Sequence, residues 1–79
     1  MTKDYYNSRK SFMPETGRLY ENEGGGIFRC LRIDAYRQTA VMRNERSGWT
    51  FDAHGVGIYK DGRIDWDYST GGFFAEMGA

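Results

Sequence analysis

The residues best suited to chemistry lie between positions 52 and 67. His54 is the only histidine and stands two residues after Asp52. In a regular strand these two side chains share one face, about 6.6 Å apart along the axis. With Asp65 and Asp67 they have the residue types of a metal site. Their spacing matches no specific metal motif, and a bend expected near His54 would separate them, so we predict neither a metal site nor a cofactor.

Asp65 and Asp67 could alternatively form the carboxylate pair of a glycosidase, because they share one face of a strand. Such catalysis needs one buried carboxyl with a raised pKa and a pocket around the substrate. The segment 63–68 instead alternates polar and apolar side chains, as a strand with one solvated face does. Cys30, the only cysteine, lies in an apolar segment that favours a buried and inert thiol. We therefore predict that the chain is not an enzyme.

These residues are positioned by a hairpin around the loop Lys60-Asp61-Gly62. A two-residue turn would leave the aliphatic side chains on the same face as the acidic ones. A three-residue loop instead pairs Ile58 with Ile64, and it pairs Val56 with Trp66. Burial favours this second register, because a slip of one residue turns every side chain to the opposite face. The glycine of the loop then takes the left-handed position of a G1 bulge.

The opposite face of the hairpin is the surface where we expect a partner to bind. Gly55 and Gly57 form its shallow floor, over which a side chain or an extended backbone of a protein partner could approach closely. The parity of the apolar positions also changes at Gly55, which predicts a bulge or sharp bend there. The predicted partner-binding residues on this outer face are Tyr59, Arg63, Asp65 and Asp67.

Composition restricts the classes of protein to which the chain can belong. The 79 residues carry 11 basic and 11 acidic side chains, so the formal net charge is zero and lacks the positive excess typical of nucleic-acid-binding proteins. No apolar run approaches the ~20 residues of a membrane span, and the N-terminus does not resemble a secretion signal. The single cysteine allows no internal disulfide. We expect one cytoplasmic domain with no membrane contact.

An arginine-rich strand face offers an alternative function, the binding of single-stranded DNA or RNA. Several arginines precede the hairpin and could form a cationic surface on adjacent strands, with an aromatic side chain for base stacking. Interleaved acidic residues oppose this alternative because they cancel the charge. The residues of the predicted nucleic-acid site are Arg29, Arg32, Tyr36, Arg43 and Arg46.

The order of the expected elements predicts an all-β fold. Short strands are expected at 18–23, 27–33 and 39–43, followed by the two strands of the hairpin, in meander order. At this length the expected architecture is a small, strongly bent meander of four or five strands. It would close into an SH3-like barrel, with an open curved sheet as the alternative.

Two terminal segments stand outside this meander. Residues 1–17 show no sustained period, so we expect a flexible or loosely docked N-terminal arm without a helix, followed by the β domain at 18–79. Phe73 and Phe74 follow the hairpin and are expected to cover the core as a lid.

The segment Ser47–Gly72, which contains the hairpin and its Gly-Val-Gly and Lys-Asp-Gly motifs, resembles part of short uncharacterised proteins of bacterial mobile elements. The resemblance covers about a third of the chain. It implies an accessory intracellular role and carries over no catalytic or binding residues. The residue patterns by themselves lead us to expect a non-enzymatic protein-interaction module, with single-stranded DNA or RNA binding as the alternative.

Overall fold

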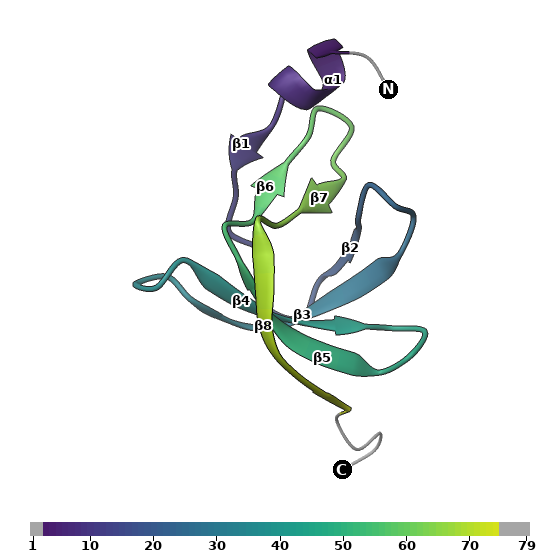
Figure 1. The fold of residues 1–79 in the computed structure, drawn as a ribbon, viewed down its shortest axis with the longest axis vertical. Helices are drawn as coiled ribbons and strands as arrows, with labels where there is room; N and C mark the ends of the chain where they lie inside the picture. Colours follow the sequence, from purple (N-terminus) through teal and green to yellow (C-terminus); the bar gives the residue numbers. More distant parts are fainter. Residues whose placement is uncertain (1–2, 75–79) are drawn as a thin grey trace.

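The computed structural model of the protein describes residues 3–74, which form two antiparallel β-sheets (Figure 1). In chain order the elements are α1 (Lys3–Asn7), β1 (Lys10–Ser11), β2 (Leu19–Glu21), β3 (Ile27–Asp34), β4 (Thr39–Asn44), β5 (Trp49–His54), β6 (Gly57–Ile58), β7 (Ile64–Asp65) and β8 (Tyr68–Phe74). The predicted all-β class is therefore confirmed.

The larger sheet has the strand order β2-β3-β4-β5-β8. Its first four strands form a meander, because each pairs with its neighbour in sequence. The chain then leaves this sheet, builds the smaller one, and returns as β8 along the free edge of β5. The β5–β8 register shifts between Thr50 and Asp52, opposite Gly71 and Gly72, whose φ angles are 70° and 121°. Such positive φ values suit glycine, so this pair forms the bulge.

The smaller sheet has the order β1-β6-β7, and its β6–β7 hairpin has the predicted register. Ile58 lies opposite Ile64, and the amide of Tyr59 donates to the carbonyl of Arg63 at 2.9 Å. The predicted bend is also confirmed, since β5 ends at His54 and Gly55 has a φ of 69°. We call residues 55–67 the ribbon, and Figure 1 shows that it stands above one end of the larger sheet.

The hydrophobic core lies between the larger sheet and the ribbon. Val56 and Ile64 enter it from the ribbon, and Trp66 packs against it with its ring centroid 5.1 Å from that of Phe28. The expectation that the aliphatic and indole groups of the hairpin meet on one face is confirmed. The buried residues of the core are Phe28, Cys30, Ala40, Met42, Phe51, Ala53, Val56 and Ile64.

Within residues 3–74 neither sheet closes into a barrel, so the expected SH3-like closure is not confirmed. The two ends of the larger sheet, β2 and β8, remain at opposite edges. The sheets are linked instead by a single parallel bridge between Asn22 and Ile64. Because the ribbon supplies the second layer over the core, closure is not needed to bury the apolar face.

Two expectations about the terminal segments are wrong. The first is the absence of a helix in the N-terminal arm. Residues 3–7 form one helical turn, whose Tyr5 packs on the ribbon and so stabilises a helix too short to show a sequence period.

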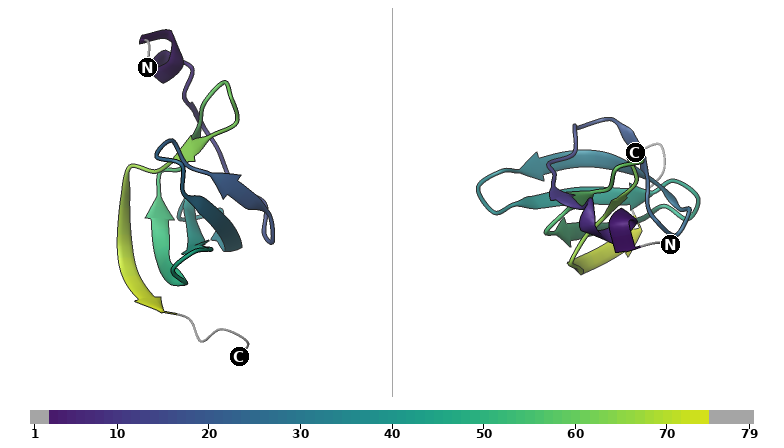
Figure 2. Two further views of the ribbon diagram at one scale, coloured as in Figure 1. Left: turned by 90° about the vertical axis from the view of Figure 1, so that its right-hand side faces the viewer. Right: turned by 90° about the horizontal axis from the view of Figure 1, so that it is seen from above.

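The second is the expected lid. Phe73 and Phe74 do not cover the core. They belong to the edge strand β8, where they lie opposite Thr50 and Trp49 and are 54% and 67% exposed, because β8 runs along β5 away from the ribbon. Figure 2 shows this end of β8 at the end of the larger sheet opposite the ribbon.

The core assignment predicts a large difference between two isoleucine truncations. Ile64 is fully buried and Ile33 is 40% exposed. We expect Ile64→Ala to lower the free energy of unfolding by about 2–5 kcal/mol, because it leaves a cavity. Ile33→Ala should lower it by about 1 kcal/mol or less. Urea denaturation followed by tryptophan fluorescence measures both, and equal losses would contradict the assignment.

Candidate partner-binding site

The most elaborate polar site of the described chain surrounds the guanidinium group of Arg9. Its Nε donates to Asp65 Oδ1 at 2.6 Å, and its Nη2 donates to the carbonyl oxygen of Gly55 at 2.7 Å and to Asp67 Oδ1 at 3.2 Å. The side chains of Arg9 and Asp65 are 29% and 24% exposed, so this contact is only partly screened by solvent. The hydrogen bond to Asp65 raises the pKa of Arg9, which is therefore a permanent cation here.

The two glycines of the ribbon make room for this guanidinium. A Cβ atom on Gly57 would lie 2.5 Å from Cζ of Arg9, closer than non-bonded atoms can approach. A Cβ atom on Gly55 would collide with the carboxylate of Asp67. The expected shallow floor of the ribbon is thus present, and the side chain of Arg9 occupies it.

A pair of stacked tyrosine rings extends the site toward the loop of the ribbon. The rings of Tyr5 and Tyr59 are nearly parallel, at 8°, with centroids 4.7 Å apart. The hydroxyl of Tyr59 donates to Asp65 Oδ2 at 2.5 Å, and that of Tyr5 donates to Asp61 Oδ1 at 3.1 Å. The hydrogen bond to Asp65, together with burial, raises the pKa of Tyr59. Asp65 therefore binds Arg9 with one oxygen and Tyr59 with the other.

Backbone pairing holds the segment that carries Tyr5 and Arg9 against the ribbon. β1 adds to the edge of β6, with Lys10 opposite Ile58 and Ser11 opposite Gly57. The amide of Lys60 also donates to the Ser8 hydroxyl at 3.0 Å. We call residues 3–11 the docked arm. It lies on the ribbon as an added strand with one helical turn before it (Figure 1).

The structure brings three of the four predicted partner-binding residues together. Tyr59, Asp65 and Asp67 surround the docked arm, but Tyr59 is only 6% exposed, so its expected place on an open outer face is wrong. The docked arm itself covers this face. Arg63 lies apart, with ion pairs to Glu21 at 3.3 Å and Asp61 at 3.8 Å.

Sequence reasoning missed Tyr5 and Arg9, the residues that fill the site. One signal could have indicated them. They are four residues apart, a spacing that places two side chains on one side of a helical turn. A cation there could have been matched to the acidic pair Asp65 and Asp67.

The predicted arginine face is only partly assembled. Arg29 lies directly opposite Arg43, and the bulge after Cys30 puts Arg32 on the same face, opposite Val41. Tyr36 lies in the β3–β4 turn and is 95% exposed, and Arg46 lies in the β4–β5 turn, so neither belongs to this strand face.

Glu45 neutralises much of this face. Its two carboxylate oxygens accept from Arg29 Nε at 3.2 Å and from Arg43 Nε at 3.1 Å. Burial alone would raise the pKa of Glu45, but the hydrogen bonds from Arg43 and Arg29 outweigh it and lower the pKa. The carboxylate is therefore held in its charged form between the two arginines.

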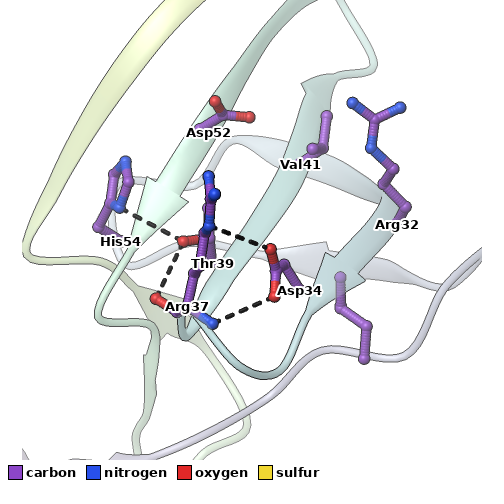
Figure 3. Close-up of a pocket in the computed structure, with 8 residues that line it drawn as sticks. Arg32, Asp34, Arg37, Thr39, Val41, Asp52 and His54 are labelled. Atoms are coloured by element: carbon purple, nitrogen blue, oxygen red, sulfur yellow. Dashed lines mark hydrogen bonds and ion pairs between the residues drawn. The ribbon is translucent and has the colours of Figure 1, made fainter.

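A polar hollow of about 230 Å³ opens on the same side of the sheet (Figure 3). Arg37 and Asp34, which form an ion pair with each other, line it together with Asp52 and His54. The imidazole of His54 stacks on Tyr68, with centroids 4.5 Å apart, and its Nε2 lies 2.6 Å from Thr70 Oγ1. Residues 3–74 contain no cluster of three side chains suited to hold a metal ion.

Comparisons with protein-family models, curated proteins and solved structures gave no match. In the part of the chain that the structure describes, no helix has the length and apolar character needed to cross a bilayer. Cys30 is fully buried, and burial raises the pKa of its thiol.

The crowding at Gly57 predicts that Gly57→Ala displaces the docked arm without unfolding the domain. The added methyl group would force the guanidinium of Arg9 away from Asp65 and the Gly55 carbonyl. Amide hydrogen exchange at Lys10 and Phe12 should accelerate at least tenfold, because the arm then opens more often. Gly24→Ala is the matched control, since a Cβ atom there lies no closer than 3.6 Å to any other group. Equal rates of amide hydrogen exchange in the two variants would show that docking of Arg9 does not require the absence of a side chain at Gly57.

The raised pKa of Tyr59 predicts a pH dependence of stability. In the unfolded chain this phenol ionises near its ordinary value of 10.0, whereas the folded chain retains the proton. The stabilisation from Tyr59 is therefore complete below that pH and is lost as the pH rises toward the raised pKa. The difference in unfolding free energy between wild type and Tyr59→Phe should shrink between about pH 9 and about pH 11. Denaturation at a series of pH values measures it, and a constant difference would contradict the assignment.

Proposed function

We propose that the chain is a non-enzymatic protein-interaction module whose ribbon binds an extended protein segment that carries an arginine. One observation supports this proposal above all. The ribbon holds the guanidinium of Arg9 with two carboxylates and a backbone carbonyl, over a floor that glycine keeps open. The surface predicted for a partner is therefore built for one kind of side chain.

The contacts of the docked arm define the mode of recognition. Backbone pairing with β6 provides affinity for any extended segment, and pockets for individual side chains provide specificity, as in other complexes formed by strand addition. Two nitrogens of the planar guanidinium reach three acceptors at once. A lysine ammonium, which is a compact point charge, would not reproduce this arrangement. A tyrosine four residues earlier adds the ring stack on Tyr59.

The docked arm is the intramolecular ligand of this site. Because it is tethered, its effective concentration at the ribbon reaches the millimolar range typical of short linkers. A partner segment must displace it before binding. In the proposed module, the tethered docked arm and an untethered partner segment of similar chemistry therefore compete for the ribbon.

The alternative function, binding of single-stranded DNA or RNA, has weaker support. Glu45 lies between Arg29 and Arg43 and competes with phosphate for both. A location in the bacterial cytoplasm and a link to mobile elements remain proposals that rest on the sequence alone.

The test of the proposed function uses the full chain with the substitution Arg9→Ala, which weakens the tethered competitor and leaves the ribbon intact. A dye-labelled peptide of residues 3–13 should bind this chain saturably. Because charge-assisted hydrogen bonds contribute about 1.5–3 kcal/mol, an Arg9→Ala peptide should bind at least about tenfold more weakly. Fluorescence anisotropy measures each Kd.

A Lys10→Ala peptide is the matched control. It loses the same charge, but its exposed side chain has no part in the clamp around the guanidinium. It should bind nearly as tightly as the wild-type peptide. Equal weakening by the two substitutions would mean that only net charge matters, and the absence of any saturable binding would refute the proposed function.

A further inference from the structure

We infer that the protein segment bound by the ribbon can be the docked arm of a second copy of this chain, so that two copies exchange their arms reciprocally. This inference rests on the proposed function, because it concerns the same site. It adds the identity of the partner. Each copy supplies Arg9 to the other copy's Asp65 and Asp67.

The contacts of the docked arm concentrate on one small target. Tyr5 packs on Tyr59, Arg9 binds Asp65 and Asp67, and β1 pairs with β6. All of these target residues belong to the ribbon. A second copy presents the same target complete, so an exchanged arm can re-form each of these contacts.

The place of the docked arm in the molecule permits exchange without collision of the two larger sheets. The molecule is elongated, with a longest extent of 42 Å. The docked arm and the ribbon lie together at one end of the long axis, and the C-terminal end of β8 lies at the other (Figures 1 and 2). Two copies can therefore meet end to end, with both sheets pointing outward.

The connection between the docked arm and β2 is long enough to redirect the chain. Residues 12–17 span up to about 20 Å when extended. Two residues of the connection, Phe12 and Glu15, line an open hollow of about 360 Å³ together with Tyr20 and Ile58 among others. Phe12 packs against the core, Pro14 is fully buried, and the amide of Gly17 donates to the carbonyl of Cys30 at 2.7 Å, so exchange requires contacts of this connection to open and re-form.

Reciprocal exchange conserves the number of arm–ribbon contacts. Two closed monomers and one exchanged dimer each contain two docked arms. The equilibrium between monomer and dimer is therefore determined by the conformation of residues 12–17 and by protein concentration. The exchanged interface is symmetric, because each copy gives an arm and receives one. A variant whose own arm and ribbon repel each other should therefore dimerise only with a complementary variant.

The test uses two full-length charge-reversal variants, Arg9→Glu and Asp65→Arg. Within each variant the arm and ribbon carry like charges and repel each other. Between the variants, Arg9 of one meets Asp65 of the other, and the introduced glutamate meets the introduced arginine. Native mass spectrometry of the mixture should show a one-to-one heterodimer at least tenfold more abundant than the homodimer of either variant alone.

A control pair reverses an ion pair that is unrelated to the arm. Asp34→Arg and Arg37→Glu alter the exposed β3–β4 turn and leave each arm and ribbon intact, so their mixture should give no more dimer than wild-type protein does. If the arm variants stay monomeric together while the Arg9→Glu chain still binds the peptide of residues 3–13, the second copy is not the partner and the proposed function stands. If the Arg9→Glu chain binds neither the Asp65→Arg chain nor the peptide of residues 3–13, both proposals are wrong.

Wild-type protein provides a measurement that does not depend on the folding of variants. Unlabelled and ¹⁵N-labelled chains are mixed over a range of concentrations up to the millimolar level. Dimers of mixed mass that increase with concentration, and that Gly57→Ala alters at least threefold, support exchange. Absence of mixed dimers at every concentration, or mixed dimers that Gly57→Ala leaves unchanged, would overturn it.

Discussion

The charge of Arg9 is the constraint on which the packing of the docked arm against the ribbon depends. A guanidinium that is removed from water must be paired and hydrogen-bonded, and here Asp65, Asp67 and the Gly55 carbonyl meet that need. The same group explains why Gly57 has no side chain and why a short terminal segment holds a fixed position. One side chain thus links the N-terminus to a hairpin more than fifty residues away.

The sequence pattern was sufficient to predict the hairpin, the bend and the strands that depend on residues close together in the chain. The alternation around Lys60-Asp61-Gly62 has only one register that buries Val56 and Trp66 together, and the structure has that register. The parity change at Gly55 likewise needs a bend, whatever the rest of the fold. The three strands before the hairpin were recognisable because Gly-rich and polar turns separate them.

The features that escaped prediction depend on contacts between distant segments. Tyr5 and Arg9 lie more than fifty residues from the groups they bind, so no local period reveals them. Nor does composition show whether β2 and β8 meet to close a barrel. Asp65 and Asp67 were predicted to face a partner, and in the structure they contact Arg9 of the same chain. No local pattern of the sequence indicates this contact.

The glycine pair of β8 bears on how readily another chain could add to this edge of the sheet. From Tyr68 to Phe74 this outermost strand contains no lysine, glutamate or proline, the residues that usually keep exposed strands from recruiting more chains. Gly71 and Gly72 interrupt the row of backbone donors and acceptors with left-handed geometry. A foreign strand therefore meets an irregular border, which is a poorer template for strand addition than a continuous row of donors and acceptors.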